Sequence, residues 1–242
     1  MDLDATQAPK AGGLRTALDV IAAPAEAFER LRVAPTWGWA LLIAIVLYAA
    51  AGFLMTGALT HATAADWPHQ IAANPRLAAQ TPEQQQRALD IGLAITRWLW
   101  IFTPIFIVIA IFIQSIVMLI FKAAGRGDAS YGKLWAAAAN IAVPAIGLNA
   151  LVTAAIVLAR GPQSFNAPSD LQMALPSLGT LVPQAPVKLH AFLAAINPFT
   201  LWNCGLTIAA MAILARVGRG WAWTTGIVGL LVAAGFVAAF TK

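Results

Sequence analysis

Residues 98–121 read WLWIFTPIFIVIAIFIQSIVMLIF, a run of 24 residues without a single Asp, Glu, Lys or Arg. An α-helix rises about 1.5 Å per residue, so about 20 apolar residues suffice to cross a hydrocarbon core of roughly 30 Å. The sequence therefore predicts an all-α, polytopic membrane protein with a bundle of five transmembrane helices. The other four uncharged stretches, each of 20 to 25 residues, are residues 37–59, 134–158, 191–215 and 221–240.

The amino-acid composition excludes a soluble domain and a nucleic-acid-binding module. The chain is 60% hydrophobic and only 10% charged, whereas a soluble domain carries about 25% charged residues. The formal net charge of +5 does not indicate nucleic-acid binding, because Lys and Arg in a polytopic membrane protein set its orientation. We therefore expect the lipid bilayer, and no nucleic acid, as the partner of this chain.

Basic residues are denser on one side of the predicted membrane. With the N-terminus inside, residues 1–36, 122–133 and 216–220 hold nine Lys and Arg, and the longer outer segments with the C-terminal tail hold six. This asymmetry predicts a cytoplasmic N-terminus and a C-terminus on the opposite side. The Ala, Pro and Arg usage is typical of a bacterial protein, so we expect a multi-pass protein of the bacterial inner (cytoplasmic) membrane with a periplasmic C-terminus.

The chain divides into a cytoplasmic N-terminal arm, residues 1–36, and a five-span transmembrane domain, residues 37–242. Apolar residues recur in the arm at near-helical spacing from Leu14 to Leu31, with one break at Pro24. Two short amphipathic helices lying on the inner membrane face fit this pattern. An arm packed loosely under the bundle is the alternative.

The segment before the second span ends with Thr81-Pro82-Glu83-Gln84. Thr at the N-cap, Pro at the first helical position and Gln at the third form a capping box. The second helix is therefore expected to start near Pro82, outside the membrane, and to project from the bilayer. Its projecting part carries an apolar face that we expect to pack on the other outer segments, and this face comprises Ala88, Ile91, Ile95 and Leu99.

No motif in the chain indicates an enzyme. Gly125-Arg126-Gly127 lacks both the Lys-Ser/Thr of a phosphate-binding loop and the strand that precedes one. No Ser or Cys in the spans has a plausible base beside it in the sequence. We therefore expect no catalytic residue, no cofactor and no enzymatic activity.

Three histidines and one carboxylate fall on the predicted outer side. Imidazole and carboxylate groups are ligands for Zn²⁺ or Cu²⁺, which raises the hypothesis of a metal site. Their spacing matches no standard metal-binding pattern, so solvated interfacial side chains are the simpler interpretation. The residues concerned are His61, Asp66, His69 and His190.

Polar but uncharged side chains inside the spans form another group of candidates. Such amides commonly make hydrogen bonds between helices, worth about 0.6 to 2 kcal/mol each. A polar cavity for a substrate or a lipid headgroup is the alternative. Asn140 lies one turn before Pro144 and is expected to face a carbonyl group freed near that proline. The group comprises Gln114, Asn140, Asn149 and Asn203.

The inner turns concentrate basic residues against a single acid, Asp128. Control of membrane topology explains such residues. A site for lipid headgroups or an acidic partner is the alternative, because each basic residue near an anionic leaflet gains about 1 kcal/mol. The residues are Lys122, Arg126, Lys133, Arg216 and Arg219.

Four short motifs follow one another along the chain. They are a Pro and a Phe before the first span, a Gly-rich turn followed by Ser-Tyr, a Pro in the middle of the third span, and Asn-x-Phe-x-x-Trp in the fourth. The residues are Pro24 and Phe28; Gly125, Gly127, Ser130 and Tyr131; Pro144; and Asn197, Phe199 and Trp202. Over about residues 18–240 the chain resembles the Yip-domain family of integral membrane proteins, in particular its bacterial members. The resemblance implies a five-helix bundle with the N-terminus in and the C-terminus out. In eukaryotic relatives it implies the binding of prenylated Rab-type GTPases in vesicle traffic.

Two functional hypotheses follow from these patterns. The first is a non-enzymatic membrane protein of the Yip type that scaffolds or organises membrane proteins or lipids, with a membrane-protein partner or a second copy of the chain in a homo-oligomer. The second is a small transporter or channel for an uncharged solute or lipid. Proton-coupled transport usually places an ionisable residue in the membrane, and the five stretches contain no Asp, Glu, Lys or Arg.

Overall fold

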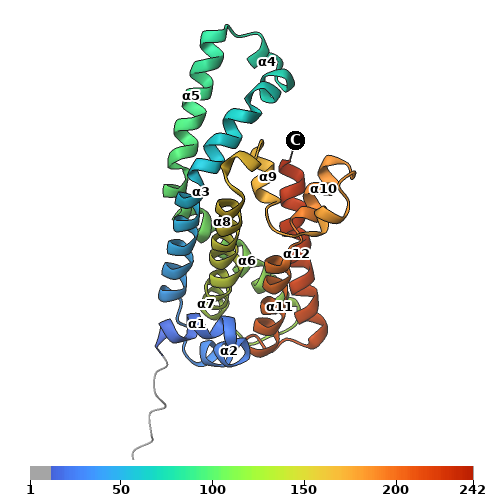
Figure 1. Ribbon diagram of the computed structural model, residues 1–242. Helices are drawn as coiled ribbons and strands as arrows, with labels where there is room; N and C mark the ends of the chain where they lie inside the picture. The colour runs from blue at the N-terminus through green and yellow to red at the C-terminus, as the bar shows by residue number, and fades with distance from the viewer. Residues whose placement is uncertain (1–11, 242) are drawn as a thin grey trace, which may run out of the picture.

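The structure is a computed structural model that describes residues 12–241, and all regular elements in this range are helical (Figure 1). The prediction of an all-α protein is thereby confirmed. The elements are α1 (Gly13–Ala22), α2 (Pro24–Val33), α3 (Gly38–Ala73), α4 (Pro75–Ala78), α5 (Pro82–Trp98), η1 (Leu99–Phe102), α6 (Thr103–Ala124), α7 (Tyr131–Ala142), η2 (Val143–Leu148), α8 (Asn149–Arg160), η3 (Pro162–Ser164), α9 (Pro168–Gln172), η4 (Leu178–Leu181), α10 (Val187–Ala194), α11 (Pro198–Ile213) and α12 (Arg219–Phe240).

The chain is a polytopic helical membrane protein. Within residues 12–241, four helical segments are long and apolar enough to cross a membrane, and the bent pair α10–α11 gives a fifth crossing if it is taken as one span. Helices α1 and α2 lie at the lower end of the bundle in Figure 1, which we call the arm end, and the C-terminus lies near the opposite end. The four continuous candidates are Gly38–Ala73, Pro82–Ala124, Tyr131–Arg160 and Arg219–Ala239.

The fourth apolar stretch is not one straight helix. Helix α10 ends at Ala194, α11 begins at Pro198, and the two are bent by 59°. Pro198 has no backbone N–H and cannot continue a helix from α10, but it fits the first helical position of α11. The Asn197 side chain caps the new helix, because its Oδ1 accepts hydrogen bonds from the backbone N–H groups of Phe199 (2.9 Å) and Thr200 (3.1 Å).

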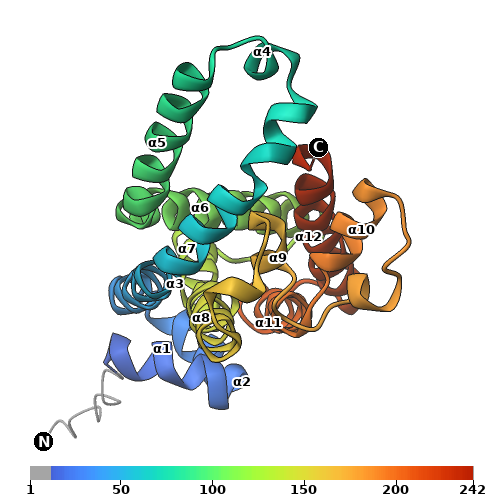
Figure 2. The same ribbon diagram turned by 45° about the horizontal axis from the view of Figure 1, so that its top comes forward.

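The first two spans extend into a helical hairpin that projects beyond the bundle (Figures 1 and 2). The second helix starts at Pro82 with the predicted capping box. The apolar stretch predicts a span over residues 37–59, whereas helix α3 has 36 residues and ends at Ala73, a length of about 54 Å. We call this end of the molecule the hairpin end. The expected packing of the α5 apolar face is wrong, because Ile91 and Ile95 are 61% and 60% exposed.

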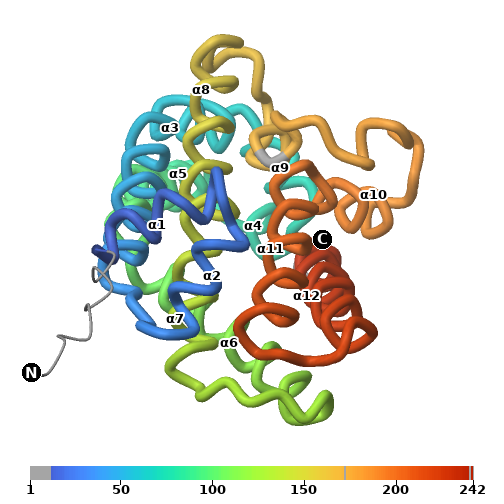
Figure 3. The backbone as a smooth tube through the Cα atoms, turned by 90° about the horizontal axis from the view of Figure 1, so that it is seen from below, coloured from blue at the N-terminus to red at the C-terminus, as the bar shows by residue number. Residues whose placement is uncertain are grey.

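The arm helices pack tightly under the bundle. Figure 3, seen from below, shows α1 and α2 lying across the ends of the longer helices. Ala17, Val20, Ala27, Phe28 and Leu31 are fully buried in the same core as residues of α3, α7 and α11. The packing is tight and not loose, while the outer face of α1 exposes the apolar side chains of Leu14 and Leu18. The position of the two helices on the inner membrane face stays a prediction. Residues 1–11 of the predicted arm lie outside the described range.

Helix α7 occupies the centre of the bundle. Residues 136–143 are at most 1% exposed, and four of them are consecutive alanines. Small side chains let neighbouring helices approach closely when lipid gives no hydrophobic drive for association. The same principle operates at Gly147, where a Cβ would lie 3.1 Å from Leu47 Cδ1 of α3. The bundle therefore has a dense centre at the arm end.

Candidate functional site

Two turns at the arm end lie against each other and form one surface. The α6–α7 turn donates the Asp128 backbone N–H to the Ala215 carbonyl of the α11–α12 turn, at 3.1 Å. A Cβ at Gly127 would lie 2.4 Å from the Ala215 carbonyl oxygen. Only glycine allows the two backbones to approach this closely. The sequence showed a Gly-rich turn, but the partner turn is 87 residues further along the chain.

The five basic candidates lie on or beside these two turns, and we call them the basic turn surface. Within residues 12–241, one carboxylate pairs with any of them: Asp128 lies 3.6 Å from the Arg216 guanidinium, and both side chains are exposed. The other four have no carboxylate partner in that range. The surface therefore carries a surplus of positive charge. Its members are Lys122, Arg126, Lys133, Arg216 and Arg219.

Two of these arginines adopt the left-handed backbone conformation. Arg126 and Arg216 both have φ of 53° and lie shortly after the ends of helices α6 and α11, at Ala124 and Ile213. After α6, the N–H of Gly127 bonds the carbonyl of Lys122 at 2.9 Å, as in a Schellman ending, where glycine usually holds the left-handed position. A side chain there costs about 1–2 kcal/mol. Backbone geometry alone would favour glycine at both positions. The presence of arginine there therefore indicates a role for the guanidinium groups.

Exposed tryptophans lie at the same end of the molecule as the basic turn surface. Trp221, at the start of α12, is 42% exposed, and a Cβ at Gly125 would lie 3.0 Å from its ring. Trp37 and Trp39, at the start of α3, are also exposed. Indole rings with one apolar and one polar edge prefer the membrane–water interface. Cations at this depth can reach phosphate groups of the adjacent leaflet.

The structure brings two of the four intramembrane amides together. The Gln114 side-chain N–H₂ on α6 donates to Asn203 Oδ1 (3.0 Å) and to Thr207 Oγ1 (3.1 Å) on α11. These bonds join two spans that are far apart in the sequence. Such a network stabilises the contact between the helices, because apolar lipid offers these groups no other partner.

Asn140 does not serve the proline that follows it. Its side chain donates to the Thr36 carbonyl (2.9 Å) and to the Ala136 carbonyl (2.8 Å). The expected bond to a carbonyl freed near Pro144 is therefore wrong. Asn140 instead bonds the segment between α2 and α3 to the central helix α7. This partner could not be predicted from the sequence, because it depends on the tertiary fold.

The family-motif residues are spread over the molecule. Pro24, Pro144 and Asn197 each stand at the start of a helical element, and Phe28 fills the core under the bundle. Tyr131 hydroxyl lies 3.2 Å from Ser115 Oγ of α6. These residues begin helices or pack them and do not meet in one site. The remaining three are Ser130, which is the N-cap residue of α7, and Phe199 and Trp202, whose rings lie 6.3 Å apart.

The histidines do not gather. Asp66 and His69 lie on the outer part of α3 with 3.8 Å between Oδ1 and Nδ1, but His190 belongs to α10. The part of the chain that the structure describes holds no group of three or more His, Cys, Asp or Glu side chains arranged to bind a metal ion. The hypothesis of a metal site at His61, Asp66, His69 and His190 therefore gains no support from the geometry.

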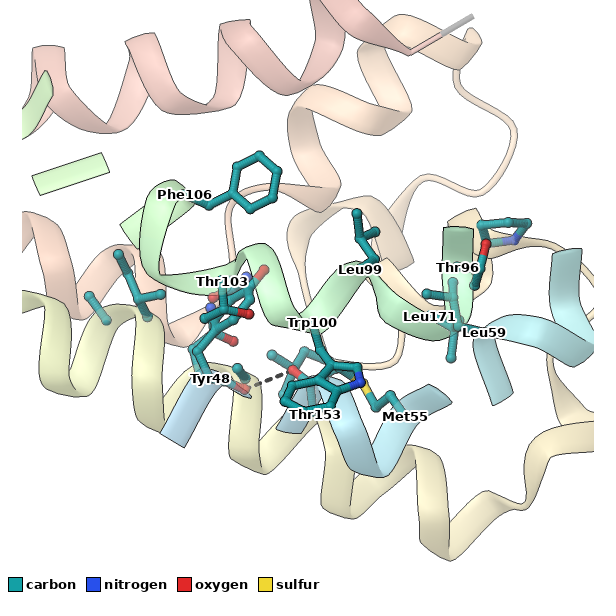
Figure 4. A pocket seen from close by; sticks show the side chains of 18 residues that line it. Tyr48, Met55, Leu59, Thr96, Leu99, Trp100, Thr103, Phe106, Thr153 and Leu171 are labelled. Carbon is teal, nitrogen blue, oxygen red and sulfur yellow. Dashed lines mark hydrogen bonds between the residues drawn. The ribbon is translucent and has the colours of Figure 1, made fainter. Parts of the chain in front are cut away.

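A cavity of about 510 Å³ lies in the hairpin-end half of the bundle, between α3, the η1–α6 segment and the η2–α8 segment (Figure 4). Asn149 and Asn197 both line it. A polar cavity was the alternative interpretation of the amide group that includes Asn149, but the sequence did not predict the position of this cavity or most of its lining residues. The available signals were Pro104 and Pro144, each of which disturbs a helix beside it, and the polar side chains of Tyr48, Thr103 and Thr153.

Comparison with known proteins gives one match. The model of the Yip1 domain matches residues 18–241, nearly the whole chain. No curated protein and no solved structure matches the chain.

Proposed function

The chain belongs to the Yip1 domain family, and on this premise we propose that it is a non-enzymatic membrane scaffold that organises lipids or membrane proteins through the basic turn surface. One observation carries the proposal. Four cations on two interlocked turns lack a carboxylate partner within residues 12–241 and lie beside interfacial tryptophans. Anionic lipid headgroups, or acidic groups of a partner at the same depth, complement this surface.

The electrostatic gain is large enough to select a ligand. Each basic residue near an anionic membrane surface contributes about 1 kcal/mol. Four unpaired cations thus favour an anionic over a neutral neighbour by about 4 kcal/mol, a factor of about 10³ in affinity. We also propose that the arm end faces the cytoplasm of a bacterial inner membrane, since its Lys and Arg then follow the positive-inside rule.

Polar side chains in the spans support a non-enzymatic role. Gln114 bonds Asn203 and Thr207, and Asn140 bonds two backbone carbonyls. Amides engaged in this way hold helices together and are not free to act on a substrate. A transporter or channel remains the second candidate, but residues 136–143 fill the centre of the bundle at the arm end, which argues against an open path.

Lipid selectivity tests the proposal. Native mass spectrometry of the purified protein, titrated with phosphatidylglycerol and phosphatidylcholine, should show preferential binding of phosphatidylglycerol. The variant Lys122→Gln/Arg126→Gln/Lys133→Gln/Arg219→Gln should lose most of that preference. The matched control removes four cations of the hairpin end, in Arg76→Gln/Arg87→Gln/Arg160→Gln/Lys188→Gln, and should keep it.

Two results would count against the scaffold. Equal selectivity in both quadruple variants would show that the basic turn surface binds no anionic lipid. Proteoliposomes that pass neutral solutes faster than empty vesicles would favour the transporter instead. If the ligand is an acidic protein, a partner should co-purify with the wild type and be lost on Arg126→Glu/Lys133→Glu.

A further inference from the structure

We propose that the hairpin-end cavity binds an uncharged lipid of the diacylglycerol type, which enters sideways from the bilayer. This site is separate from the basic turn surface and takes a different class of ligand. The cavity volume of about 510 Å³ falls in the range of pockets that hold small organic ligands, about 300–1,000 Å³. It can hold the glycerol ester region and the first part of a chain.

The depth of the cavity makes it a site for a membrane-dissolved molecule. Tyr48 and Leu59 mark its two ends on α3, which begins at Gly38. At 1.5 Å per residue they lie about 15 Å and about 32 Å along the helix. The cavity therefore spans from the middle of the hydrocarbon core to its outer boundary.

The rim of the cavity faces lipid. Leu99 and Phe106 line it and are 44% and 54% exposed on the side of the bundle. Figure 4 shows both on the same helical segment, η1 and the start of α6. On the water side, Leu171 and Leu175 of the segment around α9 cover the cavity. A ligand thus has its access from the hydrocarbon, and an apolar cover separates it from the aqueous phase.

Two irregular helical segments shape the cavity wall. The 3₁₀ segment η1 supplies Trp100, and the π-helical segment η2 supplies Ala145 and Ile146. Single π-helical turns occur frequently at functional sites, because they re-aim side chains within a helix. Here the π-helical segment ends at Leu148 and is followed by Asn149, the first residue of α8, which lines the cavity.

The chemistry of the lining selects an uncharged headgroup. No Asp, Glu, Lys or Arg lines the cavity. Within residues 12–241, the Tyr48 hydroxyl and the Asn149 side-chain amide have no hydrogen-bond partner, although Thr153 Oγ1 donates to the Asn149 backbone carbonyl at 2.8 Å (dashed in Figure 4). Tyr48 is 37% exposed, and at the depth of the hydrocarbon core its hydroxyl meets lipid and not water, so an unsatisfied polar group there gains from a ligand that bonds it. Ester carbonyls and a free hydroxyl satisfy both groups, whereas a phosphate finds no cation.

Photolabelling tests the site. The purified protein in nanodiscs receives either a diacylglycerol or a phosphatidylglycerol, each with a photoreactive group on one acyl chain, and labelled residues are mapped by mass spectrometry. We expect the diacylglycerol to label Met55, Leu59 and Leu99 at least about tenfold more than the phosphatidylglycerol does, since one lost hydrogen bond and an unpaired charge together exceed 1.4 kcal/mol.

Variants separate a specific site from general contact with lipid. Ala150→Phe fills the cavity and should abolish this labelling, while Ala155→Phe, on an exposed face of the same helix and outside the lining, should leave it intact. Tyr48→Phe removes one hydroxyl and should weaken labelling about fivefold. Added diacylglycerol should raise the melting temperature of the wild type and of Ala155→Phe, but not of Ala150→Phe.

Several outcomes would overturn the proposal. Equal labelling by both lipids would refute the selection for an uncharged headgroup. Labelling that is unchanged in Ala150→Phe, or absent in the wild type, would show that the cavity holds no lipid. The quadruple variant of the basic turn surface should label as the wild type does, so failure of one site is distinguishable from failure of the other.

Discussion

At the scale of single residues, Asn140 joins two parts of the chain that the sequence leaves far apart. Its buried amide N–H₂ holds the Thr36 carbonyl, 104 positions earlier, as well as the Ala136 carbonyl of its own helix. The sequence shows Asn140 as a polar residue in a span. Its hydrogen-bond partner, however, depends on how the arm helices pack against the bundle. A hydrogen bond of this kind becomes visible only in the tertiary structure.

The Asn140→Ala variant should therefore unfold at a lower temperature than the wild type. It leaves the half-buried Thr36 carbonyl without its donor, which costs about 1–3 kcal/mol. Tryptophan fluorescence during thermal unfolding in detergent measures the change. Asn149→Ala is the matched control, because the Asn149 amide has no hydrogen-bond partner within residues 12–241. Equal losses in the two variants would contradict the assigned role of Asn140.

Arg126 and Arg219 allow charge to be separated from stability. Arg126 has φ of 53°, whereas Arg219 is the first residue of helix α12. Arg126→Gly should raise the stability by about 1 kcal/mol because it relieves the left-handed conformation, while Arg219→Gly should lower it by up to about 1 kcal/mol. Each should weaken phosphatidylglycerol binding about fivefold. If Arg126→Gly instead destabilised the protein, the side chain would have a packing role.

At the scale of elements, local chemistry decides which boundaries are predictable. The start of α5 was predictable because its capping box lies within four consecutive residues. The end of α3 was not, because hydropathy falls after residue 59 and the helix nevertheless continues through Pro68 until Asn74-Pro75. The break at Asn197-Pro198 had a local signal, an Asn-Pro pair, but the uninterrupted apolar run concealed it.

The contact between α11 and α12 depends on Gly226. A Cβ at this position would lie 2.5 Å from Ile208 Cγ1 and 2.9 Å from the Cys204 carbonyl oxygen. Gly226→Leu should therefore push the two helices apart and cost about 1–3 kcal/mol, seen as a lower melting temperature and a broader elution profile. Gly229→Leu, where a Cβ meets nothing within 4 Å, should be tolerated. Comparable damage from both substitutions would refute this packing arrangement.

At the scale of the whole molecule, the pattern of charge fixes the fold class more firmly than it fixes any site. Five uncharged stretches sufficed to predict a helical bundle in a membrane. The candidate surface needed more, because it joins the turn at residues 125–130 to the turn at residues 214–218. The hairpin-end cavity is lined by residues of α3, of the α5–α6 and η2–α8 segments, of the segment around α9 and by Asn197. These segments are far apart in the sequence.

The arrangement of the termini gives a prediction about topology. The arm helices and the C-terminus lie at opposite ends of the bundle, as an odd number of crossings requires. Alkaline phosphatase fused after Lys242 should be active if the arm end faces the cytoplasm, because the enzyme needs disulfides that form in the periplasm. A fusion at Ala79, in the hairpin, should also be active, and one at Asp128, in the arm-end turn, should be inactive.

The opposite result would reverse the orientation: an active phosphatase fused at Asp128 and an inactive one fused after Lys242. The basic turn surface would then meet the periplasmic leaflet, and the positive-inside argument for its role would fall.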